Sequence, residues 1–179
     1  MIKLKIISGK YKGRIIKGYE VEGTRPTMDR VRESLFATIQ PYLTNRVVLD
    51  LFAGTGSLGL EALSNGAKKA IFVDKNRICI NNIKETLNKI NVSEETKLIN
   101  KHYKEALKEI GEVDIIFLDP PYHEKLLNKV IKEIEELNIL KENGLLITEF
   151  EEEKPICNYK LIKEKKYGDK YINIYIKAL

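Results

Sequence analysis

The sequence predicts an α/β protein built on a doubly wound, mostly parallel seven-stranded sheet. Apolar runs typical of buried strands alternate with segments of helical periodicity, which is the pattern of repeated strand–helix units. The end of the chain differs, because two alternating segments flank a Gly168-Asp169 turn and predict an antiparallel hairpin. A parallel sheet with a mixed edge therefore accounts for the whole pattern. The expected strands are 46–51, 69–74, 96–100, 113–118, 145–150, 159–166 and 171–177.

An N-terminal extension precedes this core. Residues 2–20 predict a short hairpin-like pair of strands, and residues 27–39 predict a helix that Pro41 stops shortly afterwards. We expect residues 1–40 to form a small basic extension packed on a core of residues 41–179, in a single compact unit. Glu142, Asn143 and Gly144 predict a turn before the strand at 145–150. The helices expected in the core are 57–65, 76–90, 104–110 and 124–138.

The tetrapeptide Asp119-Pro120-Pro121-Tyr122 follows the apolar run 113–118. A carboxylate and a backbone carbonyl that accept the two N–H hydrogens of an exocyclic amine return electron density to its nitrogen in the transition state. The prolines stiffen the turn and fix the direction of the Pro120 carbonyl, and the Tyr122 ring offers a face on which a base can stack. This turn alone is also consistent with a rigid strand-to-helix connection. Together with the features below, it predicts methylation of a nucleobase amine, with Asp119, Pro120 and Tyr122 as catalytic residues.

A glycine-rich turn follows the strand at 46–51. Gly54, Gly56 and Gly59 have the spacing of a nucleotide-binding turn, and Asp74 ends the next strand, where a carboxylate suits two ribose hydroxyls. The charge of Asp50 would repel the pyrophosphate of a nicotinamide or flavin cofactor, but it can serve the ammonium of S-adenosylmethionine directly or through water. We therefore expect S-adenosylmethionine as the cofactor. The expected binding residues are Asp50, Phe52, Gly54, Gly56 and Asp74.

The composition excludes several classes of protein. With 179 residues, of which 43% are hydrophobic and 32% charged, the chain has the size and composition of one globular domain. No apolar stretch reaches membrane-spanning length, so we expect no membrane partner. Cys79 and Cys157 lack the spacing of a metal or redox site, and the chain has only two histidines. We therefore expect no metal, and the reduced thiols of a cytoplasmic protein.

The excess positive charge lies at the N-terminus. Residues 1–33 contain nine basic and four acidic side chains, a net charge of +5 that equals the net charge of the whole chain. Glycines and Tyr11 interrupt the cations, as in an extended element that presents them to a phosphate backbone. A solvated lysine-rich face is the alternative, but the turn at 119–122 independently calls for a base. We therefore expect Lys10, Lys12 and Arg14 to contact nucleic acid.

These motifs resemble a known family, the bacterial small-subunit rRNA guanine-N2 methyltransferases of the RsmD type, over nearly the whole chain. The glycine turn and Asp-Pro-Pro-Tyr occur in many amino-methyltransferases. The pattern R-P-T-x-D-R-V-R-E-x-L-F at residues 25–36 is far more specific, and it carries the substrate assignment. The matching segments are Ile7–Arg14, Thr24–Phe36, the glycine turn, Leu118–Tyr122 and Tyr167–Tyr171.

The resemblance implies a Rossmann-like, class I methyltransferase fold. It implies transfer of a methyl group from S-adenosylmethionine to the N2 amine of one guanine in 16S rRNA, within an assembled or assembling small ribosomal subunit. Asp119 and the Pro120 carbonyl would accept the amine, and Tyr122 would stack on the base. Arg25 and Thr27 would shape the entrance beside the cofactor. Related enzymes often have an acidic residue after the third strand for the adenine amine, but this chain has His102 at that point. Either His102 or a backbone carbonyl would take the role, and we interpret His102 as a surface residue and do not include it among the site residues.

Two alternatives stay open. A DNA adenine-N6 or cytosine-N4 methyltransferase uses the same catalytic turn, but it usually needs a further sequence-reading domain, for which 179 residues leave no room. The other alternative is a non-catalytic rRNA-binding protein that retains a vestigial cofactor fold, which the intact carboxylates at Asp50, Asp74 and Asp119 argue against. We expect a monomeric cytoplasmic enzyme that acts on 16S rRNA.

Overall fold

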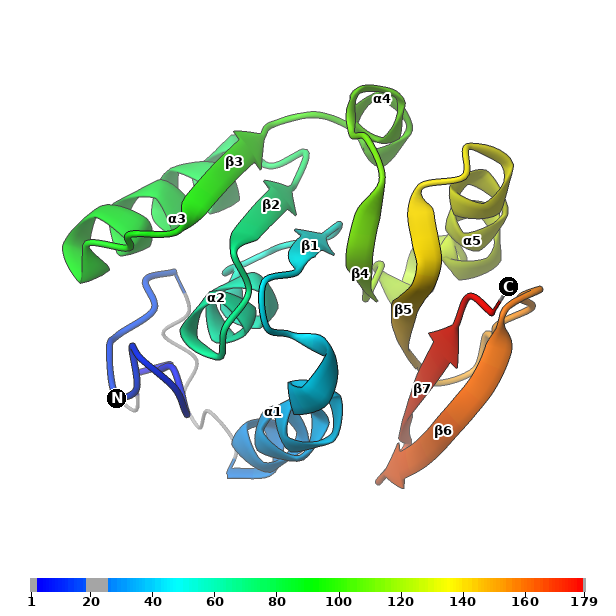
Figure 1. Cartoon of the computed structure of the whole chain (residues 1–179), viewed down its shortest axis with the longest axis horizontal. Helices are drawn as coiled ribbons and strands as arrows, with labels where there is room; N and C mark the ends of the chain where they lie inside the picture. Colours follow the sequence, from blue (N-terminus) through cyan, green and yellow to red (C-terminus); the bar gives the residue numbers. More distant parts are fainter. Residues whose placement is uncertain (1–2, 19–25, 179) are drawn as a thin grey trace.

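The computed structural model describes residues 3–18 and 26–178, except for the side chains of Pro26, Thr27 and Tyr122. Its strands are β1 Val47–Asp50, β2 Lys69–Val73, β3 Glu95–Ile99, β4 Val113–Leu118, β5 Leu140–Phe150, β6 Lys160–Tyr167 and β7 Lys170–Ile176. They form one sheet in the order β3-β2-β1-β4-β5-β7-β6 (Figure 1). The strands from β1 to β5 pair in parallel, whereas β7 is antiparallel to both β5 and β6. The predicted parallel sheet with a C-terminal antiparallel hairpin is therefore confirmed.

Helices cover both faces of this sheet. They are α1 Pro26–Ile39, α2 Ser57–Ser64, α3 Arg77–Ile90, α4 Tyr103–Glu109 and α5 Leu127–Glu136, with short 3-10 helices η1 Gln40–Tyr42 and η2 Tyr122–Glu124. Alternate residues of a strand point to opposite faces, so neighbours along one strand enter different cores. In β1, Val48 packs with residues of α1, α2 and α3, and Leu49 packs with residues of α4 and α5. Within the described ranges, every helix is too short or too polar to cross a membrane.

The helix α3 illustrates how the local sequence specifies these elements. Its buried residues include Ile80, Ile83, Leu87 and Ile90, which recur at intervals of three and four residues and so lie along one face. The side chain of Asn76 caps the N-terminus by accepting a hydrogen bond from the Ile78 N–H at 2.9 Å. The helix ends at a residue in the left-handed conformation, as many helices do. The prediction of a helix at 76–90 is therefore confirmed, within one residue.

Two segments differ from the sequence-based prediction. The turn expected at Glu142–Gly144 lies inside β5, where the ladder with β4 shifts from the pair Val113–Leu140 to the pair Ile115–Leu145. The extra residues form a bulge in which Asn143 has a φ of 65°. The hairpin-like pair expected at 2–20 forms in part: among the described residues 3–18, Lys5 and Ile15 make an antiparallel bridge, and backbone hydrogen bonds from Ile16 to Leu4 and from Ile6 to Arg14 flank it. The glycine at position 13, with a φ of 84°, lies in the connection between the bridged residues.

A buried carboxylate fixes the N-terminal segment to the core. Glu61 of α2 is fully buried and accepts hydrogen bonds from the backbone N–H groups of Ile7 and Ser8 at 2.9 and 3.0 Å. The guanidinium of Arg32, which is also buried, lies 3.4 Å from the Glu61 carboxylate. That guanidinium also donates to the Lys5 carbonyl, at 2.6 Å. Glu61 thus joins α1, α2 and the N-terminal segment, and Leu4, Ile6 and Ile16 of that segment enter the same apolar core as the sheet.

Candidate active site

Three carboxylates meet at the carboxyl edge of the sheet. Asp50 ends β1, Asp74 directly follows β2, and Asp119 directly follows β4. The parallel pairing places Asp50 beside Phe72 of β2 and Phe117 of β4, so the ends of the three strands are level. Ligands of open α/β sheets bind at this edge, where the strand order reverses. Asp50, Asp74 and Asp119 therefore lie at the same edge of the sheet, as the sequence predicted.

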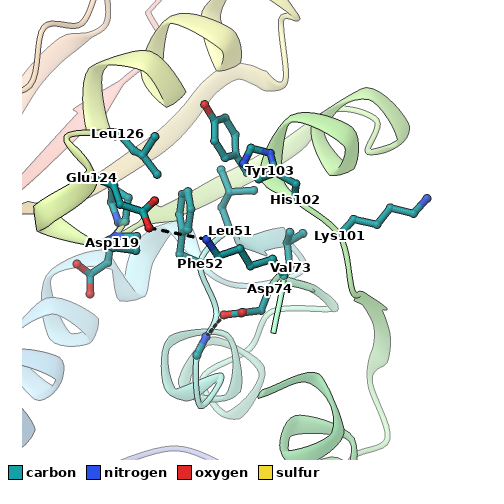
Figure 2. Close-up of a pocket in the computed structure, with 14 residues that line it drawn as sticks. Leu51, Phe52, Val73, Asp74, Lys101, His102, Tyr103, Asp119, Glu124 and Leu126 are labelled. Carbon is teal, nitrogen blue, oxygen red and sulfur yellow. Dashed lines mark hydrogen bonds and ion pairs between the residues drawn. The ribbon is translucent and has the colours of Figure 1, made fainter. Parts of the chain in front are cut away.

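A cavity of about 290 Å³ lies at this edge. It is near the lower limit of the roughly 300–1,000 Å³ that small-molecule sites occupy. Figure 2 shows the side chains around it, with Asp74 on the β2 side and Asp119 on the opposite side. Five of the predicted site residues line the cavity, namely Phe52, Gly54, Asp74, Asp119 and Pro120.

The glycine turn is held by Asp74. One oxygen of the Asp74 carboxylate accepts from the Gly54 N–H at 2.9 Å, and the other accepts from the Asn76 N–H at 2.8 Å. Gly54 has a φ of 56°, and a Cβ at this position would meet no atom within 4 Å. The turn therefore leaves open space above its backbone, as a ligand cradle requires. Gly56, with a φ of 78°, is the N-cap of α2.

Asp50 lies beneath this turn and is almost fully buried, with 3% of its surface exposed. Its carboxylate accepts a hydrogen bond from the Gly59 N–H in the first turn of α2, at 3.0 Å. Burial raises the pKa of Asp50 to about 7, with a smaller contribution from the negative charge of Asp74, and the Gly59 hydrogen bond opposes the shift. Substitution of Gly59 by a larger residue is unfavourable, because an added Cβ would lie 2.4 Å from the Phe72 ring.

Asp119 stands in a second group of charges. Burial, above all, raises the pKa of the Asp119 carboxyl well above its usual value. The Glu149 carboxyl, which is hydrogen-bonded to Asp119, raises it further, whereas Lys170 lowers it. The Lys170 ammonium lies 3.1 Å from the Glu149 carboxylate. The raised pKa favours the protonated form of Asp119, so a partner that donates N–H groups to its carboxylate must displace this proton.

The remaining predicted site residues lie in different places. Arg25 lies outside the described residues. The backbones of Thr27 and Tyr122 belong to α1 and η2, but their side chains are not described. Lys10 pairs with Glu94, before β3, at 3.2 Å, and Arg14 donates to the Lys89 carbonyl in the last turn of α3 at 2.9 Å.

The basic N-terminal residues are therefore remote from the cavity. The helix α3 begins close to Asp74 and has 14 residues, which corresponds to a length of about 21 Å. Arg14 contacts the far end of this helix. Lys12 lines a second hollow of about 480 Å³, together with Lys3 and Lys5. The structure thus brings Phe52, Gly54, Asp74, Asp119 and Pro120 together at one cavity, and it places Lys10, Lys12 and Arg14 away from it.

Three residues of the cavity were not predicted from the sequence, namely Lys75, Tyr103 and Glu124. Lys75, after β2, and Glu124, in η2, form an ion pair at 3.8 Å that joins two sides of the cavity (Figure 2). The rings of Phe52 and Tyr103 lie 5.7 Å apart and provide an apolar wall. His102 caps α4 by accepting from the Lys104 N–H at 3.3 Å, and it also lines the cavity. Lys75, Tyr103 and Glu124 come shortly after β2, β3 and β4, and this position at the same edge of the sheet was the signal that could have identified them.

The fold and the carboxyl-edge site define the class of protein, a class I methyltransferase fold of Rossmann-like architecture. The chain belongs to the family described as conserved hypothetical protein 95, whose family model matches residues 4–176. A relative from Haemophilus influenzae, named ribosomal RNA small subunit methyltransferase D, is 40% identical, and the match covers 93% of this chain and 90% of the relative. The Escherichia coli K12 protein of the same name is 32% identical, over 97% of this chain and 89% of that protein.

Solved structures agree with this membership. The Escherichia coli protein yhhF superposes with a TM-score of 0.88 at 28% identity, and the match covers 99% of each chain. The Haemophilus influenzae protein HI0767 superposes with a TM-score of 0.83 at 36% identity, again over 99% of each chain. The similarity therefore extends over the N-terminal segment and the C-terminal hairpin as well as the central sheet.

Proposed function

We propose that this protein transfers the methyl group of S-adenosylmethionine to the exocyclic N2 amine of a guanine in 16S rRNA of the small ribosomal subunit. The observation that carries the proposal is a desolvated carboxylate, Asp119, followed by two prolines on one wall of a cavity whose opposite wall carries Asp74 and the glycine turn. The names of the relatives support rRNA of the small subunit as the substrate. The chemistry of the Asp119 turn supports an exocyclic amine as the methyl acceptor, and the choice of the guanine N2 amine rests on the resemblance of the N-terminal motif.

The residues of the cavity fit S-adenosylmethionine. Asp74 stands at the strand end where a carboxylate can accept from two ribose hydroxyls. The open space above Gly54 admits a ligand close to the backbone, and Phe52 and Tyr103 give an apolar wall for a flat adenine. When bound, S-adenosylmethionine supplies a methyl group that is already activated on a sulfonium. The Asp50 carboxyl lies beneath the turn, and a cationic end of the cofactor bound on that side would favour its ionised form.

The protein's own contribution is positioning and electrostatics. Asp119, once deprotonated, accepts one N–H of the target amine, and the Pro120 carbonyl accepts the other. Because both acceptors hold the amine in one orientation, the nitrogen lone pair points to the methyl donor. The proton that the nitrogen loses on transfer passes to the Asp119 carboxylate. The ring of Tyr122 would stack on the base. A base reaches this cavity only when it leaves its helical stack, so a loop or bulge of the RNA is the expected target.

Methyl transfer to defined substrates tests this function. Labelled S-adenosylmethionine is offered with undermethylated small subunits, naked 16S rRNA and unmodified DNA, and the products are digested to nucleosides and identified by mass spectrometry. The proposal expects N2-methylguanosine from the small subunits or the rRNA. N6-methyladenine or N4-methylcytosine in the DNA would instead identify the DNA-modifying alternative, and no product with any substrate would favour a non-catalytic rRNA-binding protein.

The substitution Asp119→Ala tests the catalytic assignment. Loss of one preorganised hydrogen-bonding group in a transition state typically lowers kcat by about 100- to 1,000-fold, so we expect a loss of this size with the affinity for S-adenosylmethionine largely retained. The rate is measured with small subunits, and the affinity by calorimetry. The matched control is Glu136→Ala, which removes an exposed carboxylate on α5. Near-parent transfer by the Asp119 variant would refute its role.

A further inference from the structure

Three charged side chains from three different strands form a row beside the catalytic turn. Asp119 follows β4, Glu149 lies near the end of β5, and Lys170 begins β7. The ladder between β4 and β5 pairs Leu118 with Thr148, which brings the next residues of the two strands, Asp119 and Glu149, side by side. Their carboxyl groups are hydrogen-bonded, and the Glu149 carboxylate is 3.1 Å from the Lys170 ammonium. The row therefore runs in the order carboxyl, carboxyl, ammonium.

The row is partly open to a ligand. The side chain of Glu149 is 22% exposed and that of Lys170 is 43% exposed, so neither side chain is sealed in the interior. The hydrogen bond between two carboxyl groups requires a proton between them, because two bare carboxylates repel each other. A ligand that brings two neighbouring N–H donors can replace this proton and satisfy both carboxylates.

We propose that Glu149 and Lys170 read the Watson–Crick edge of the target guanine, with Glu149 accepting from N1–H and Lys170 donating to O6 while Asp119 accepts from the N2 amine. This inference rests on the proposed function. Guanine presents one acceptor and two donors in a row, namely O6, N1–H and the N2 amine, and this order matches Lys170, Glu149 and Asp119. A flipped base is commonly read through this edge.

The same row rejects other bases. Adenine and cytosine place an acceptor nitrogen next to their exocyclic amine, so the Glu149 carboxylate would face a lone pair where guanine offers N1–H. A site built around specific hydrogen bonds strongly rejects an analogue that leaves its polar groups unpaired. The row would therefore favour guanine over the bases modified by the DNA-directed relatives of this catalytic turn.

The analogue 2-aminopurine separates base reading from catalysis. It keeps the amine on C2, but its N1 is an acceptor and it has no O6. The experiment uses small subunits reconstituted around ligated 16S rRNA that carries either guanosine or 2-aminopurine riboside at the nucleotide the parent enzyme modifies. We expect the parent to methylate the guanosine substrate with a kcat/KM higher by about 100-fold or more.

The variant Glu149→Gln should change this preference. Its amide oxygen can still accept from guanine N1–H, and its amide N–H can donate to N1 of 2-aminopurine. We expect the guanosine to 2-aminopurine ratio to fall by about tenfold or more, because transfer to the analogue rises while transfer to guanosine falls. A purely structural role of Glu149 would lower both rates in proportion and leave the ratio unchanged. The control Glu152→Gln, an exposed residue just after β5, should keep the parent ratio.

The variant Lys170→Met provides a second measurement. It should lower transfer to guanosine by about tenfold and leave transfer to 2-aminopurine unchanged, because the analogue has no O6. A guanosine to 2-aminopurine ratio that stays within about threefold of the parent's in both variants would overturn the base-reading role. If N2-methylguanosine still forms in that case, the proposed function is retained and only the base-reading role of Glu149 and Lys170 is rejected. If the parent forms no N2-methylguanosine, both proposals fail together.

Discussion

The buried carboxyl of Asp50 should make the stability of the protein depend on pH in a predictable direction. Its pKa is about 7 in the folded chain, against 3.8 for an ordinary Asp. As the pH rises above about 4, the unfolded chain releases this proton while the folded chain keeps it, so the folded state loses stability relative to the unfolded state. The loss is complete near pH 7, where the folded group also ionises, and it stays constant above that pH.

The pKa difference sets the size of the effect. At about 1.36 kcal/mol per pKa unit, the shift from 3.8 to about 7 corresponds to about 4 kcal/mol of lost stability above pH 7. About 3 kcal/mol of this loss falls between pH 5 and pH 8. For a chain of this size, 1 kcal/mol moves the melting temperature by about 2–4 °C, so the expected shift is about 6–12 °C.

The test compares thermal melts of the parent and Asp50→Asn between pH 5 and pH 8, without cofactor. The amide that replaces the Asp50 carboxyl does not ionise and can still accept from the Gly59 N–H. The melting temperature of the variant should therefore rise relative to that of the parent as the pH increases. An incompletely paired buried amide costs about 1–3 kcal/mol at every pH. The test therefore uses the change of the melting-temperature difference with pH, and not its absolute value. Asp169→Asn, in the exposed β6–β7 turn, is the control. A difference between variant and parent that stays constant from pH 5 to pH 8 would refute the reasoning.

Three further predictions follow from other contacts. Glu61→Gln removes the charge from a buried ion pair and should lower the free energy of unfolding by about 3–5 kcal/mol in denaturant titrations; a loss below about 1 kcal/mol would contradict the anchoring role. Gly59→Ala should cost about 1–3 kcal/mol in the same assay, because the new methyl group meets a buried ring of β2. Charge reversal of Lys10, Lys12 and Arg14 should weaken binding to 16S rRNA and flatten its salt dependence. Equal affinity across a salt series, with Lys129 and Lys132 reversed as the control, would exclude an RNA contact at these three residues.

The sheet and its catalytic edge were predictable because both depend on short-range patterns. Apolar strands such as 113–118 carry their own hydrophobic signal, and a polar residue directly after a parallel strand lies at the carboxyl edge by geometry alone. Asp74 and Asp119 follow from this rule. Glu149 does not follow from it, because Glu149 lies inside β5, which ends at residue 150, and its position beside Asp119 depends on the register between two strands.

The parts that were not predictable depend on contacts between distant residues. Glu61 lies in an apolar stretch of α2, and only its partners Arg32 and Ile7, more than 25 residues away, explain why a charge is buried there. The positions of Lys10 and Arg14 depend on where the N-terminal segment meets the far end of α3. The turn expected at 142–144 became a bulge because the ladder between β4 and β5 continues through it.

The anchoring of the N-terminal segment has a consequence for any attempt to isolate a smaller catalytic unit. A deletion that begins the chain after residue 40 would remove Arg32 and the backbone donors at Ile7 and Ser8, and Glu61 would keep a negative charge inside the protein with its main partners gone. The same cut would expose the apolar face on which Leu4, Ile6 and Ile16 pack. Because α2 begins at the glycine turn, the damage would extend to the cofactor cradle. Shortened forms of this protein should therefore lose ligand binding together with solubility, and a workable boundary lies before residue 4.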